Sequence, residues 1–109
     1  MAKQRPSLAV IYTFAARDEL RGIWSYNAKR RSTKQANSYE DFLMRGIDRL
    51  ADEYGQGEDV TGFPEFKSLI LIKRRGGDGH VVIYEIDAAA GTVNILHVYH
   101  TKQDWPAKL

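Results

Sequence analysis

Three apolar, β-rich runs fill the last third of the chain and constrain its fold more than any other feature. They cover residues 69–72, 81–86 and 93–98, and turn-forming residues at 76–79 and 87–92 separate them. Short strands with such turns between them predict an antiparallel meander. A three-stranded sheet is marginal by itself, so the front half of the chain must cover its apolar face.

The front half begins with a predicted strand and a predicted helix. Residues 8–14 place apolar side chains on both faces, as in a strand that is buried on both sides. From Ala15 the pattern changes to that of a helix, and residues 27–35, which hold Ala28 as their one apolar residue, should form its end and a turn.

A second helix is predicted over residues 39–54, because apolar residues recur there at three-and-four spacing. Ser32 or Ser38 is a suitable N-cap, and Gly55 is well placed to end the helix. Residues 56–65 should form a loop. The predicted fold class is therefore α+β, ordered β-α-α-β-β-β, with a helical hairpin packed on a small antiparallel sheet that includes an N-terminal strand.

Length and composition limit the kind of protein. The 109 residues suit one domain over 1–109 with one core. The absence of cysteine excludes disulfides and thiolate sites, and the three histidines show no recognised ligand spacing, so neither a metal nor a cofactor is expected. The absence of a signal-like or membrane-spanning stretch leads us to expect a cytoplasmic protein with no membrane partner.

The net charge of +2 hides a segregation along the chain. Residues 1–34 carry eight Lys or Arg against two Asp or Glu, residues 35–65 two against eight, and residues 66–109 six against four. The runs at 29–31 and 73–75 permit a polyanionic or acidic protein partner, but the balance falls short of a dedicated nucleic-acid binder. A solvated face remains the default interpretation of the first run.

The element order and the closing string "VNILHVYHTKQDWP" resemble the ParE branch of the RelE/ParE superfamily of bacterial toxins. The resemblance extends from Leu8 to Pro106. It includes "YTFAARDELRGIWSY" at the first helix, the spacing of Ala36, Tyr39, Leu43 and Ile47 in the second, and "HVVIYEI" in the second of the three runs. Residues 62–67, which precede the first of the three runs, and the two histidines of the closing motif depart from the common pattern.

The resemblance implies a toxin of a type II toxin-antitoxin system that inhibits DNA gyrase by binding, without catalysis. The C-terminal strand and tail are implicated in target binding in the ParE branch. Carried over to this sequence, the candidate target-binding residues are His97, Tyr99, His100, Lys102, Asp104 and Trp105. His97 as a strand residue with a satisfied hydrogen bond, and Trp105 as a packing residue, are the structural alternatives.

The RelE branch, in contrast, cleaves messenger RNA in the ribosome, and this activity is the first alternative. A meander brings the end of one strand near the start of the next, so a basic cluster with histidines could form at one edge. The residues for such an endoribonuclease are Lys73, Arg74, His80, His100 and Lys102. Val81 stands where RelE-like toxins carry an essential arginine, which favours the gyrase hypothesis.

A toxin of this type also implies a ParD-like antitoxin, through which alone it would reach operator DNA. The antitoxin would bind a groove made with the helical hairpin, for which the candidate residues are Leu20, Ile23, Trp24, Phe42, Ile47 and Leu50. The simpler interpretation of these six is that they are core residues. A non-toxic small protein-binding domain is the second alternative.

Overall fold

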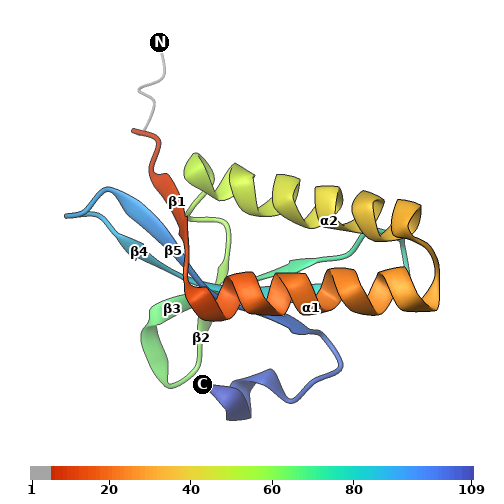
Figure 1. The fold of residues 1–109 in the computed structure, drawn as a ribbon. Coiled ribbons are helices and arrows are strands. Elements are labelled where there is room, and N and C mark those ends of the chain that lie inside the picture. The colour runs from red at the N-terminus through yellow and green to blue at the C-terminus, as the bar shows by residue number, and fades with distance from the viewer. Residues whose placement is uncertain (1–5) are drawn as a thin grey trace.

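The computed structural model describes residues 6–109 and consists of two layers, a sheet and a pair of helices on one of its faces (Figure 1). The helices are α1 (Phe14–Arg30) and α2 (Thr33–Asp48), and the strands are β1 (Ala9–Tyr12), β2 (Glu58–Val60), β3 (Phe63–Leu71), β4 (His80–Asp87) and β5 (Thr92–His100). Short 3₁₀ turns follow α2 and end the chain. The predicted α+β fold is confirmed. None of the described helices is long and apolar enough to cross a membrane.

Serine and threonine caps fix where the two helices begin. The Thr13 hydroxyl accepts the amide N–H of Ala16, and the Ser32 hydroxyl accepts that of Gln35 at 3.1 Å. Residues 27–35 are therefore helical except for a tight turn at Arg31 and Ser32, which corrects the longer turn expected there. The second helix also starts six residues earlier than its apolar spacing predicts and gives way to the 3₁₀ turn Arg49–Ala51.

The sheet has the strand order β1-β5-β4-β3-β2. Strands β3, β4 and β5 form the predicted antiparallel meander. The segment expected to be a loop at 56–65 instead contains β2 and the start of β3, and β2 pairs antiparallel to β3. Glu58 and Asp59 lack the alternation that marks a strand in sequence, so only the pairing with β3 makes this segment one.

The N-terminal strand β1 lies at the edge of the sheet and pairs parallel to β5. The sheet is therefore mixed, which corrects the prediction of an antiparallel one. Val10 and Tyr12 pack on the core beneath the helices, whereas Ile11 on the other face is 48% exposed. The expectation that this strand is buried on both faces is wrong, because no layer covers its second face.

Two apolar clusters stabilise the fold, one on each face of the sheet. The larger lies between the sheet and the helices and includes Leu43, Ile47, Leu50, Tyr84 and Ile95. The smaller lies on the opposite face, which we call the open face. There Val81, Ile83 and Tyr99 are buried, and Phe66, Leu96, Trp105 and Leu109 pack against them. The C-terminal tail thus folds back to cover part of the open face (Figure 1).

Candidate functional site

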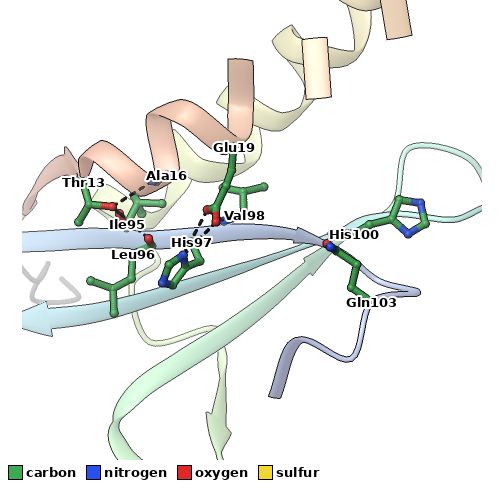
Figure 2. A network of polar contacts seen from close by, with 9 residues as sticks. All are labelled: Thr13, Ala16, Glu19, Ile95, Leu96, His97, Val98, His100 and Gln103. Carbon is green, nitrogen blue, oxygen red and sulfur yellow. Dashed lines mark hydrogen bonds and ion pairs between the residues drawn. The ribbon is translucent and has the colours of Figure 1, made fainter. Parts of the chain in front are cut away.

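The edge of β5 changes its partner at Thr13, where β1 ends and α1 begins. The Thr13 amide donates to the Ile95 carbonyl at 3.0 Å. The Thr13 hydroxyl lies 2.9 Å from the same oxygen and 3.0 Å from the Leu96 carbonyl, while it accepts from Ala16 (Figure 2). One residue therefore caps the helix and continues the edge of the sheet.

Glu19, about one and a half turns further along α1, hydrogen-bonds the next residues of the β5 edge. Its carboxylate accepts the Val98 amide at 2.9 Å and a hydrogen bond from Nδ1 of His97 at 3.0 Å (Figure 2). The His97 ring in turn stacks on Tyr99, with ring centroids 4.9 Å apart. Since β1 no longer pairs with β5 here, Glu19 supplies the acceptor that the Val98 amide would otherwise lack.

A β-bulge in β5 turns two consecutive side chains to the open face. His97 lies opposite Ile83 and Ile95 opposite Tyr84, which leaves Leu96 as the extra residue. A bulge of this kind bends a strand and redirects its side chains. Figure 2 shows Leu96 and His97 both pointing away from α1. The bulge therefore builds part of a surface on the open face.

That surface is a groove of about 420 Å³ lined by Thr13, Ala15, Phe63, Phe66, Leu96, His97, Lys108 and Leu109. The rings of Phe63 and Phe66 stack with centroids 5.4 Å apart. Phe14 lies between two of the lining residues in the chain, and its side chain is 82% exposed. Apolar grooves and exposed aromatic side chains are both typical of protein-binding surfaces.

His80 lies at the far end of the sheet, in a different environment. It is opposite His100 in the strand register, with ring centroids 5.2 Å apart, and is 9% exposed. Burial, and then the neighbouring charge of His100, lower the pKa of His80 to about 4. Burial also raises the pKa of Tyr39 to about 12. The Tyr39 hydroxyl and Nδ1 of His80 lie 2.6 Å apart and share a hydrogen bond.

A sequence model described as the ParE toxin of the type II toxin-antitoxin system, parDE, matches residues 10–105. The chain belongs to the ParE toxin family of type II toxin-antitoxin systems. No curated protein sequence matches this ParE-family chain.

Three solved structures share the fold of this ParE-family chain. The chromosomal ParDE toxin-antitoxin system from P. aeruginosa is 13% identical with a TM-score of 0.74, over 90% of this chain and 100% of that one. A mutant of E. coli toxin RelE in the free state is 13% identical with a TM-score of 0.64, over 94% of this chain and 92% of that one. A RelBE toxin-antitoxin complex from Mycobacterium tuberculosis is 21% identical with a TM-score of 0.58, over 94% and 100%.

The predicted target-binding residues of this ParE-family chain do not form one surface. His97 lines the groove, but Tyr99 is buried and Trp105 packs beside it on the open face. The His100 ring contacts the His80 ring at the far end of the sheet. Lys102 and Asp104 follow β5 in the chain and are exposed. His97 also has the satisfied hydrogen bond that the structural alternative anticipates.

The predicted ribonuclease residues gather at one end, as the meander argument expects, yet each has a structural role or faces solvent. Lys73 donates to the Ser38 hydroxyl at 2.6 Å, and Lys102 pairs with Asp78 at 3.3 Å. His80 is buried against Tyr39, whereas Arg74 is exposed on the β3–β4 turn. Among residues 6–109, no group of three or more histidine or carboxylate side chains could hold a metal ion.

The predicted antitoxin-binding residues divide into two sets. Leu20, Ile47 and Leu50 are buried in the core between the sheet and the helices, so they are not available for direct contact in this conformation. Apolar residues on the inner stripe of a helix pack on the sheet first. Ile23, Trp24 and Phe42 are only half-buried, and for these three the antitoxin contact stays a prediction.

Sequence reasoning missed the residues that form the groove and the β5 edge in this ParE-family chain. Glu19 resembles an ordinary acidic residue at the start of a helix, and Phe63 lies in a segment expected to be a loop. The phenylalanines of "GFPEF" three residues apart are a signal that could have identified the groove.

We expect Glu19→Ala to destabilise the fold by about 1–2 kcal/mol, because it leaves a backbone N–H and an imidazole without their acceptor at a partly covered edge. Amide hydrogen exchange of Val98 should accelerate in this variant. Asp18→Ala is the matched control, since Asp18 is exposed and forms only a 3.8 Å pair with Arg21. Unchanged protection of the Val98 amide in Glu19→Ala would contradict the assigned role.

Proposed function

We propose that this ParE-family chain inhibits DNA gyrase by binding it through the open-face groove, without catalysis. The observation that carries the proposal is an apolar groove lined by Phe63, Phe66 and Leu96, together with Phe14, which is 82% exposed and lies between the lining residues Thr13 and Ala15 in the chain. Interfaces concentrate their binding energy in such aromatic anchors next to pockets. His97 contributes a polar group within the same groove, held in place by Glu19.

The chemistry of His80 supports binding over ribonuclease activity. A general base works best with a pKa near the pH at which the enzyme operates. His80 has a pKa lowered to about 4, so it is a weak base, and its Nδ1 is hydrogen-bonded to Tyr39. These features are those of a core histidine.

The proposal includes a ParD-like antitoxin that neutralises the chain. Ile23, Trp24 and Phe42 are half-buried on the helices, and Trp24 is fixed by its indole N–H, which donates to Asn37 at 2.8 Å. In the described part of the chain β2 pairs with β3 only as far as Ser68, so the next residues of β3 have an open edge. An extended antitoxin segment could pair with such an edge.

The proposal is tested with Phe14→Ser, and with Tyr26→Ser as the matched control. Both remove an exposed aromatic from α1, but Tyr26 is near the other end of the helix. Inhibition of supercoiling by purified gyrase and decay of a reporter message are measured side by side. We expect Phe14→Ser to weaken gyrase inhibition at least about tenfold, as for a binding hot spot, and Tyr26→Ser to leave it unchanged.

Other outcomes would reject the proposal in distinct ways. Message cleavage with normal supercoiling would indicate the ribonuclease, and no effect on either would indicate the non-toxic binding domain. A point variant is sharper than removal of residues 104–109, because Trp105 and Leu109 cover the buried residues Val81, Ile83 and Tyr99. Loss of the tail would therefore combine a change of surface with a loss of stability.

A further inference from the structure

The two basic runs of the sequence, about forty residues apart, meet at one end of the folded molecule. The α1–α2 turn and the β3–β4 turn both lie at that end (Figure 1). Lys73 after β3 donates to Ser38 of α2, and a groove of about 510 Å³ is lined by Lys73 of the second run and by Lys34, three residues after the first run. We call this surface the basic end: Lys29, Arg30, Arg31, Lys34, Lys73, Arg74, Arg75 and Lys102.

All eight cations of the basic end are exposed, and few acidic groups offset them. Within residues 6–109, Lys102 is the one cation of the eight that forms an ion pair, with Asp78 at 3.3 Å. Asp41 also lines the groove, but so do Arg45 and Arg49. The charge segregation along the sequence thus becomes a segregation in space.

Carboxylates gather at the opposite end of the molecule. Backbone hydrogen bonds from Leu8 to Ala51 and from Ala9 to Gly91 bring the end of α2 and the β4–β5 turn together there. The acidic residues of these segments are Asp48, Asp52, Glu53 and Asp87. Such a polarity would orient the protein in the field of a polyanion.

The helix dipoles explain only part of the basic end. Lys29 and Arg30 lie in the last turn of α1, where cations are favourable. Arg31 and Lys34 flank the start of α2, where the dipole disfavours cations, and the first turn of α2 contains no acidic residue. Stability alone would place Asp or Glu at that helix start. These two cations are therefore better explained by a ligand than by the fold.

We propose that the basic end binds the phosphodiester backbone of a nucleic acid. Arg and Lys supply most phosphate contacts, and guanidinium groups match phosphate oxygens in bidentate geometry. Three of the cations are held by partners within the chain: Arg30 lies over the Tyr26 ring at 5.1 Å, Lys73 binds Ser38 and Lys102 binds Asp78. Such restraint reduces the entropy lost on binding.

An acidic protein segment has the same charge but fits the surface less well. Protein interfaces need apolar anchors at their centre. The two turns, residues 31–33 and 73–79, contain no apolar side chain, and the exposed Ile70 and Ile72 come before the second turn, at the end of β3. The proposal goes beyond gyrase inhibition. It does not depend on gyrase inhibition, because binding to nucleic acid is measured on the purified chain without gyrase.

The test measures fluorescence anisotropy of a labelled random-sequence DNA duplex and of a single-stranded RNA of equal length, from about 50 to 200 mM salt. The variant is Arg31→Gln/Arg74→Gln/Arg75→Gln. The control is Arg17→Gln/Arg21→Gln/Lys67→Gln, which removes the same charge elsewhere. We expect the first variant to weaken binding at least about tenfold and to reduce the slope of log affinity against log salt concentration by about two to three. The control should change the affinity less than about twofold.

The DNA and RNA arms identify which nucleic acid supplies the phosphates. Equal weakening by the two triple variants would overturn the proposal, because net charge rather than this surface would then govern binding. The absence of binding to both probes would overturn it too. So would binding of poly-glutamate in preference to both nucleic acids, which would indicate an acidic protein partner. Circular dichroism melts of both variants establish that each is folded.

Discussion

Acidification from about pH 7 to about pH 4.5 is expected to remove about 2 kcal/mol of stability through His80 alone. The pKa of His80 is lowered to about 4 in the folded protein, whereas the unfolded chain has an ordinary value near 6.5. Between these values the unfolded chain binds more protons than the folded one. The stabilisation is therefore complete above pH 6.5 and is lost as the pH falls through that window.

Urea denaturation at both pH values, for the wild type and Tyr39→Phe/His80→Phe, measures this contribution. Replacing both partners by apolar groups avoids an orphaned hydroxyl, since the Tyr39 hydroxyl and Nδ1 of His80 are hydrogen-bonded at 2.6 Å. The difference between the proteins isolates His80 from the carboxylates, which titrate in both. An equal loss of stability in the two proteins would show that His80 does not titrate as expected.

Gly79→Ala is expected to destabilise the protein by about 3 kcal/mol. A Cβ atom at residue 79 would lie 2.3 Å from the carbonyl oxygen of Leu71 and 2.7 Å from Cγ1 of Ile72. The backbone has little room to move away, because Gly79 exchanges hydrogen bonds with Thr101, including one from the Thr101 amide at 3.0 Å. The close approach of residue 79, just before β4, to the end of β3 therefore requires glycine.

Gly22→Ala is the matched control, since no heavy atom lies within 4 Å of a Cβ at that helical position. Alanine is the better helix former, so this variant should gain about 1 kcal/mol. The midpoints of urea denaturation measure both changes. Stabilisation by both substitutions would show that the chain around residue 79 is free to adjust.

The helices and strands differ in how well the local sequence pattern predicts them. The Ser32 cap and the meander could be predicted because each depends on residues close in sequence. Strand β2 could not, because Glu58 and Asp59 become a strand only by pairing with Ser68 and Lys67. The parallel pairing of β1 with β5 joins residues more than eighty positions apart.

The groove and the β5 edge depend on one extra residue in a strand. Period-2 alternation places Leu96 and His97 on opposite faces, and the bulge places them on the same one (Figure 2). No residue near position 96 predicts that bulge. The bulge depends on the register of β5 with β4 and on the contacts of Thr13 and Glu19 at the opposite edge of β5. The sequence therefore predicted the strand that carries the candidate site, but not which of its side chains lie on the open face.

The sequence by itself determined the fold class, the family resemblance, the helical hairpin and the meander, because hydrophobic periodicity and turn chemistry act over a few residues. Only the tertiary structure decided that His80 is buried and that His97 is fixed by Glu19. It also decided that the turns which carry the two separate basic runs lie at the same end of the molecule (Figure 1). Burial, strand register and the meeting of distant charges depend on which segments pack together, and local periodicity carries no information about that choice.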